Sequence, residues 1–139
     1  MTAIWPDSLP LPTRAGYGQQ RMDGRMRKSA ETGPPGYRRR YSSNASAMSL
    51  VLLASRAQKA TFDVFWDETL SAGSLPFLMA DPVSNDWPLL TSDGKALLTH
   101  DGAAILVARQ LLCLMGEAPP SETLRGVTFE IGFAIVVMP

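Results

Sequence analysis

The sequence predicts a mainly β domain with one α-helix packed on the sheet, and three observations lead to this fold class. Residues 127–137 alternate large apolar side chains with smaller or polar ones, which is the period of a half-buried strand. The short apolar run at residues 48–54 is bounded by polar residues, as a core strand would be. Between these two runs, aromatic residues recur at helical spacing within residues 56–71. A chain of 139 residues can build a single core of this kind.

The first 36 residues are dense in proline and glycine, with three X-Pro pairs near the start and Gly-Pro-Pro-Gly at 33–36. Proline at this density prevents a continuous helix and favours extended chain with turns. We therefore expect residues 1–36 to form an extended N-terminal arm and residues 37–139 to form a single β-rich domain. The arm either becomes ordered against a partner or stays disordered in the isolated subunit.

Three consecutive arginines stand between two tyrosines at the start of the β-rich domain. In a strand, Arg38 and Arg40 would share one face, whereas Tyr37, Arg39 and Tyr41 would share the other. Adjacent guanidinium groups repel one another, so a chain gains by gathering them only where acidic groups of another element or chain face them. Together with the preceding cations they form the predicted interface: Arg25, Arg27, Lys28, Tyr37, Arg38, Arg39, Arg40 and Tyr41.

The predicted helix, about 56–71, has recognisable start and stop signals. Ser55 and Gln58 have the spacing of a capping box, in which each side chain binds the other residue's backbone N–H. Gly73 is placed to end the helix. Four residues recur on one stripe and are expected to pack on the sheet as the core helix: Phe62, Phe65, Trp66 and Leu70.

An eight-residue repeat follows the helix and a short edge-like strand at residues 75–82. Residues 89–94 (Leu-Leu-Thr-Ser-Asp-Gly) are echoed by residues 97–102 (Leu-Leu-Thr-His-Asp-Gly). Asp-Gly between apolar runs favours a type I′ hairpin turn, so we expect a projecting hairpin region at about 87–104. Residues 103–115 have helix-favouring composition but follow a turn, and we prefer a strand there. The final strand is expected at residues 127–137.

The charge is distributed unevenly although the chain is neutral as a whole. Residues 1–45 hold eight cations and three carboxylates, a net charge of +5, whereas the remainder holds five cations and ten carboxylates, a net charge of −5. Such a dipole suits head-to-tail self-association. Two alternatives stay open: a solvated basic segment that folds back on its own acidic part, and a nucleic-acid-binding module in which Tyr17, Tyr37 and Tyr41 lie among the cations.

The residues that usually carry catalysis or bind metals are too few here. His100 is the single histidine, and the single cysteine, Cys113, lies in an apolar run and is expected to be a small buried residue. Asp93 and Asp101 are explained by turn chemistry, and the chain has no nucleophile elbow and no phosphate-binding glycine loop. We expect a soluble, non-enzymatic protein without cofactor or metal. The apolar stretches are too short or too interrupted to span a membrane.

The order of these signals resembles a family of phage proteins. The residues that carry the resemblance lie mostly within positions 4–82 and in the final strand: Trp5-Pro6, Leu9-Pro10, Gly16-Tyr17, Gly33-Pro34, the segment from Tyr37 to Tyr41, the capped helix with Gln58, Phe62, Phe65 and Trp66, the run from Gly73 to Phe77, and Asp81-Pro82. This order is similar to that of the minor tail and distal tail proteins of long-tailed bacteriophages, the lambda-like minor tail protein M group included. The Asp-Gly repeat departs from the pattern of the shorter members.

The resemblance implies a β-sandwich or split barrel related to tail-tube proteins, with one packed helix. It further implies a homo-oligomeric ring, most simply a hexamer, where the tail tube meets the hub and tip proteins. Such a subunit is made in the cytoplasm of the host bacterium and resides in the virion tail. It would bind no membrane and no specific nucleic acid, although DNA could pass through the lumen of the ring. A head–tail connector or tail terminator subunit is the alternative within the same class.

Overall fold

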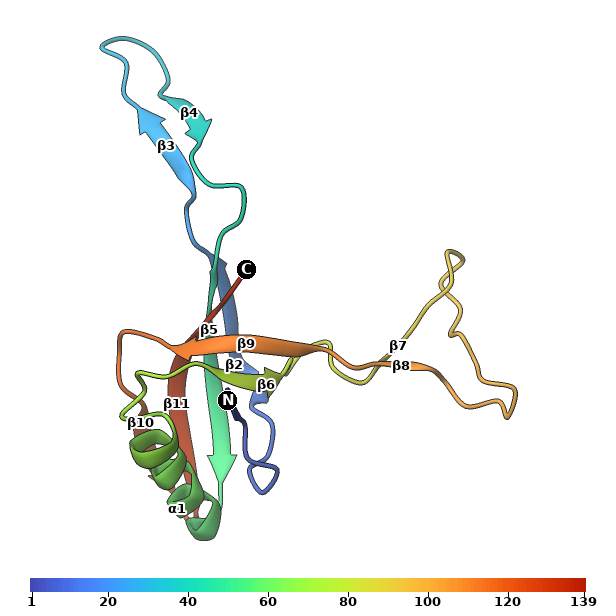
Figure 1. The fold of residues 1–139 in the computed structure, drawn as a ribbon. Coiled ribbons are helices and arrows are strands. Elements are labelled where there is room, and N and C mark those ends of the chain that lie inside the picture. Colours follow the sequence, from blue (N-terminus) through green and yellow to red (C-terminus); the bar gives the residue numbers. More distant parts are fainter.

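A computed structural model describes all residues, 1–139, and shows a small body from which two long hairpins project (Figure 1). The body is a seven-stranded sheet, in which six strands have the order β1-β6-β9-β11-β5-β2. The seventh strand, β10, pairs with the first half of β11, and β9 pairs with the end of β11. Only β1 and β6 run parallel, so the sheet is mixed. Its strands are β1 (Ala3–Ile4), β2 (Thr13–Arg21), β5 (Ser46–Ala54), β6 (Phe77–Ala80), β9 (Gln110–Met115), β10 (Ser121–Arg125) and β11 (Thr128–Val137).

The two longest core strands, β5 and β11, each bury alternate side chains, which sets the buried face of the sheet. Along β5 the side chains of Met48, Leu50, Leu52 and Ala54 are all buried, and Phe133 of β11 lies opposite Leu50 in the antiparallel register. Because strand side chains alternate between faces, one face of the sheet becomes apolar and needs a cover. The predicted class is confirmed as mainly β with one helix packed on the sheet, and the sheet does not close into a barrel.

The helix supplies that cover. It comprises α1 (Arg56–Val64) and a π-helical turn, η1 (Phe65–Thr69), and begins with the predicted capping box, in which Gln58 Oε1 accepts from Ser55 N at 2.9 Å. Trp66 is half-buried at the edge of the core, where its ring leaves no room for a Cβ on Gly73, the residue with φ of 79° after the helix. The other members of the predicted stripe are buried: Phe62, Phe65 and Leu70.

The first 21 residues belong to the body, which differs from the expected arm of residues 1–36. Trp5 is 6% exposed and stacks on Phe133, with ring centroids 5.8 Å apart and planes at 19°. Leu9 is also buried, and β2 pairs with β5 along the open edge of the sheet. The prolines occupy the irregular connection between β1 and β2, and burial of two large apolar side chains favours this segment inside the core.

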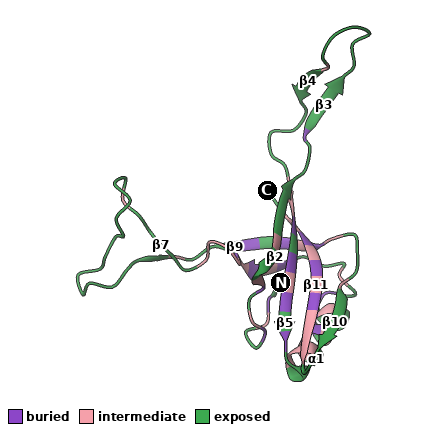
Figure 2. Cartoon of the chain, turned by 180° about the vertical axis from the view of Figure 1, so that it is seen from behind, coloured by how far each residue is buried: buried purple, intermediate pink, exposed green.

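The two projecting segments are called the basic hairpin (residues 22–45) and the junction arm (residues 82–108). The basic hairpin continues β2 and β5 outward and contains β3 (Arg25–Lys28) and β4 (Gly36–Arg39). The junction arm leaves between β6 and β9 and contains β7 (Trp87–Pro88) and β8 (Leu106–Val107), so residues 103–115 form strands, as preferred from the sequence. Both segments are exposed over almost their whole length, in contrast to the body (Figure 2).

Candidate interaction site

The basic hairpin brings together the residues of the predicted interface. Its ladder pairs Arg25 with Arg39 and Arg27 with Tyr37, so these four side chains share one face. The opposite face carries Met26, Lys28 and Arg38, of which Met26 pairs with Arg38. Like charges directly across a strand pair destabilise it. The one like-charged pair across this ladder, Arg25 with Arg39, therefore weakens the isolated hairpin.

Part of the first face is neutralised within the hairpin. Arg25 Nε lies 2.8 Å from Asp23 Oδ1, and its guanidinium lies 4.5 Å from the centroid of the Tyr37 ring. Hydrogen bonds from the Arg25 side chain and backbone lower the pKa of Asp23 to about 2. Asp23, Arg25 and Tyr37 therefore contact one another at the base of the hairpin, and the charge of Arg25 is neutralised there.

The three arginines predicted to act together have different surroundings. Arg39 Nε donates to the carbonyl oxygen of Tyr41 at 3.0 Å, so it holds the bend after β4. Arg40 lies over the Tyr41 ring, 5.2 Å from its centroid. Arg38 differs from both because its side chain makes no ion pair, hydrogen bond or cation–π contact within the chain. Three cations of the hairpin have no side-chain partner of any of these three kinds: Arg27, Lys28 and Arg38.

The junction arm has an architecture that the sequence analysis did not foresee. Beyond the β7–β8 stem, Leu89 N donates to Ile105 O at 2.7 Å, Ile105 N donates to Leu97 O at 2.9 Å, and Leu97 N donates to Leu89 O at 2.8 Å. These three hydrogen bonds form a closed circuit at residues spaced eight apart. The circuit joins the stem to two short hairpin lobes, and we call it the three-way junction. The arm splits into these lobes at its end (Figure 1).

The two lobes are closed in the same way, and the predicted type I′ turns are wrong. In the first lobe Gly94 N donates to Thr91 O at 2.9 Å, and Thr91 N donates to Lys95 O at 2.8 Å. Gly94 and Gly102 have φ of 79° and 83°, whereas the aspartates before them have no positive φ. A type I′ turn needs two such residues, so the loops are three-residue loops with glycine alone in the left-handed region.

The surface of the junction arm is apolar and acidic. Outside the Asp81–Arg109 ion pair at its base, it carries Asp86, Asp93 and Asp101 against Lys95, a net charge of −2. The paired apolar residues of the repeat are the sequence signal that could have predicted this exposed apolar surface. Seven large apolar side chains of the arm are exposed by 37–58%: Trp87, Leu89, Leu90, Leu97, Leu98, Ile105 and Leu106.

A buried carboxylate anchors the junction arm to the body. Asp81 is 5% exposed, and its oxygens accept from Val83 N at 2.9 Å and Ser84 Oγ at 2.6 Å, with Arg109 Nε at 3.4 Å. Burial favours the neutral acid, but hydrogen bonds from Ser84 and Val83 and the charge of Arg109 outweigh it, so the pKa of Asp81 lies below its ordinary value. The ionised form therefore holds both ends of the arm together.

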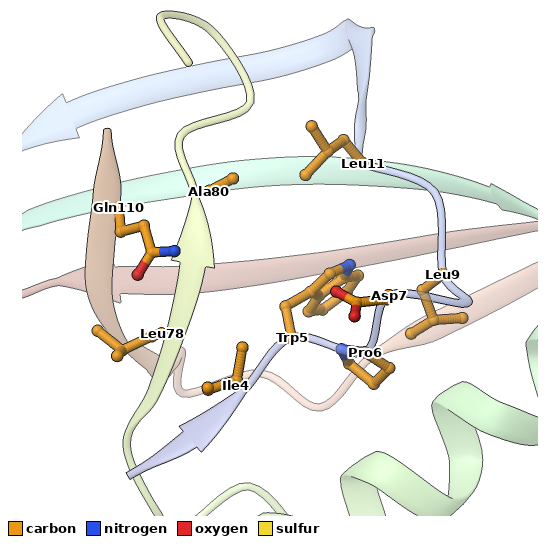
Figure 3. Close-up of a pocket in the computed structure, with 9 residues that line it drawn as sticks. All are labelled: Ile4, Trp5, Pro6, Asp7, Leu9, Leu11, Leu78, Ala80 and Gln110. Atoms are coloured by element: carbon orange, nitrogen blue, oxygen red, sulfur yellow. The ribbon is translucent and has the colours of Figure 1, made fainter. Parts of the chain in front are cut away.

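One of the hollows of the body lies beside Trp5. Figure 3 shows this space of about 260 Å³ between the segment that follows β1 and the side chains of Leu78, Ala80 and Gln110. The buried Trp5 Nε1 donates to no acceptor in the protein. Elsewhere, Cys113 is fully buried as expected, and burial raises the pKa of its thiol to about 12.

No family model, no curated protein and no solved structure matches this chain. No group of three metal-ligating side chains is present, and His100 lies in an exposed lobe, where its Nε2 is 2.9 Å from Asp101 Oδ1. None of the helical segments has the length and apolar character required to cross a bilayer.

Proposed function

We propose that this chain is a non-enzymatic structural subunit that forms a homo-oligomeric ring, hexameric in the simplest case, at the distal end of a long-tailed phage tail. The observation that supports this proposal is the pair of long hairpins that project from a small body and expose unneutralised cations on one and apolar side chains on the other. The sequence resemblance to minor and distal tail proteins points the same way.

The energetics of an isolated hairpin favour an assembled state. A two-stranded hairpin with no third strand and no core is marginal in water, and like charges across its ladder weaken it further. Carboxylates of a neighbouring subunit would neutralise the unpartnered cations Arg27, Lys28 and Arg38 and so stabilise the hairpin in the assembly. Because the two segments leave the body in different directions, each subunit can contact two neighbours through different surfaces. Contacts of this head-to-tail kind close into rings when the rotation between subunits permits.

In this proposal the ring links the tail-tube protein to the hub and tip proteins, and its subunits are made in the host cytoplasm before they join the virion. DNA would pass through the lumen without sequence-specific contacts. A head–tail connector or tail terminator is the alternative position for such a ring. Electron microscopy of intact tails with labelled subunits distinguishes these positions, because only the distal ring lies at the tip.

The test measures whether the purified chain forms rings and whether the unpartnered cations hold them together. Light scattering after size-exclusion chromatography and negative-stain microscopy should show a ring that dissociates as ionic strength rises. The double variant Lys28→Ala/Arg38→Ala should fold but stay smaller than the ring. The control Arg14→Ala/Arg56→Ala removes the same charge from exposed arginines of the body and should still assemble. A chain that is monomeric at every concentration contradicts the proposal.

A nucleic-acid-binding module is the second candidate, because Arg27 and Tyr37 lie side by side on an exposed face. It predicts tight binding to DNA whose logarithmic affinity falls linearly and steeply with the logarithm of salt concentration. Fluorescence anisotropy with a labelled oligonucleotide at several salt concentrations measures this directly. Tight binding by a monomeric chain would favour this candidate over the ring.

A further inference from the structure

We propose that the three-way junction of one copy is the docking surface for the basic hairpin of a second copy. This inference rests on the proposed ring and names the contact that would hold it together. The docking faces would be the apolar and acidic surface of the junction arm and the Met26, Lys28 and Arg38 face of the basic hairpin.

The charges of the two segments are complementary. The basic hairpin holds six cations and two carboxylates, a net charge of +4, whereas the junction arm beyond its basal ion pair has a net charge of −2. Lys28 and Arg38 have no carboxylate partner in their own chain, and neither does Asp93 at the tip of the first lobe. Opposite charges of this kind guide the approach of two surfaces and set their register.

The apolar content of the two segments also matches. The exposed apolar side chains of the junction arm together leave several hundred Å² uncovered, which is at the upper end of what a monomer usually exposes. The basic hairpin offers Met26 on its docking face, with Met22 and Tyr41 at its base, each about half exposed. A standard interface removes about 800 Å² from each partner, and the exposed apolar surface of the junction arm supplies much of that area on its side of the contact.

The geometry places this contact between copies rather than within one. The basic hairpin extends from the β2–β5 end of the sheet, and the junction arm extends sideways from β6 and β9, so their tips point away from each other (Figures 1 and 2). A subunit then presents one surface on each side, and every copy can give its hairpin to one neighbour and accept the hairpin of another. Such a contact uses two different surfaces and suits ring closure.

Disulfide trapping tests the contact with the full chain. The variants Met26→Cys and Leu98→Cys are purified separately, mixed and oxidised mildly, and the buried Cys113 stays silent because its thiol is inaccessible. We expect a covalent dimer that contains one copy of each variant. Leu124→Cys, an exposed leucine of β10, replaces Leu98→Cys in the control and should give no such dimer with Met26→Cys.

Charge reversal tests the same contact without a crosslink. Lys28→Glu/Arg38→Glu and Asp93→Lys/Asp101→Lys should each weaken self-association by at least roughly tenfold, and the quadruple variant that combines them should assemble again. Circular dichroism spectra identical to that of the unaltered chain confirm that each variant folds. Recovery in the quadruple variant is the result that a merely structural role of these charges would not produce.

The possible outcomes separate the inference from the proposed function. Rings that persist without the mixed dimer and without charge rescue overturn the docking contact but leave the ring intact. A covalent dimer formed by Leu98→Cys alone, with no mixed dimer, assigns the junction to a contact with its own equivalent and also overturns it. If the chain floats with phosphatidylglycerol vesicles and Leu90→Asp/Leu98→Asp abolishes this flotation, the apolar surface of the junction arm binds lipid, and the docking contact is overturned. A chain that never self-associates overturns both proposals.

Discussion

Replacement of Trp5 by alanine should destabilise the whole body, although this residue lies in a segment that the sequence places outside the core. Trp5 is 6% exposed. Its ring centroid lies 5.6 Å from that of Phe65 and 5.8 Å from that of Phe133. Truncation of a buried tryptophan to alanine typically costs about 3–5 kcal/mol, through lost transfer free energy and the cavity left behind. The unpaired Nε1 donor already costs the native state about 1–3 kcal/mol, so we expect a loss near 3 kcal/mol.

The assay is equilibrium unfolding in urea, followed by far-UV circular dichroism at a protein concentration where the chain is monomeric. Trp87→Ala is a matched control, because this tryptophan is 49% exposed on the junction arm and its loss should change the free energy of unfolding by less than about 0.5 kcal/mol. Trp5→Phe keeps an aromatic ring and removes the unpaired donor, so it should cost less than about 1.5 kcal/mol. Equal stability of Trp5→Ala and Trp87→Ala would refute the assignment of residues 1–21 to the body.

Three further substitutions address the helix and the base of the junction arm. In Gly73→Ala the new Cβ would lie 2.4 Å from the Trp66 ring at φ of 79°, so the urea midpoint should fall by the equivalent of about 1–3 kcal/mol. Gly33 also has positive φ, but a Cβ there would meet no neighbouring atom. An equal loss of stability in Gly33→Ala would therefore contradict the steric argument. The pKa of Asp81 is lower folded than unfolded, so its ionisation stabilises the fold above the ordinary value of 3.8 and this contribution is lost as pH falls through the folded pKa. Asp81→Asn should therefore be less stable than the unaltered chain at neutral pH, and a urea series across pH should show the gap closing in acid; a constant gap would contradict it. Ser55→Ala removes half of the capping box and should cost about 1 kcal/mol, and an unchanged midpoint would show that the cap contributes little.

The parts of the fold that follow from local periodicity could be predicted from the sequence. The alternation along β11, the apolar run of β5 and the capped helix each carry their own signal within ten or so residues, and each is present as expected. The assignment of Trp5 could not be made in this way. Its burial depends on long-range pairing of β1 with β6 and on packing against Phe133, and neither contact leaves a local pattern.

The candidate site was predicted in part. The cation cluster is evident in the sequence, but the division between arginines that bind their own hairpin and those without a partner depends on the bend after β4. The three-way junction lay in the repeat itself, because Leu89, Leu97 and Ile105 are spaced eight apart. The repeat contains only two copies of the turn, and the third apolar pair, Ile105–Leu106, which closes the circuit, is followed by no Asp-Gly.

The circuit at Leu89, Leu97 and Ile105 also bears on the order in which the chain folds. β6 and β9 are neighbours in the sheet, and pairing them across an unstructured segment of this length would cost closure entropy. In the folded chain the lobes close over three residues each, the junction holds the stem strands together, and Asp81 N donates to Arg109 O at 2.9 Å at the base of the stem. If the arm forms early, the pairing of β6 with β9 follows a series of contacts between residues close in sequence. Folding is faster when contacts are local in sequence, so this order would speed the formation of the sheet.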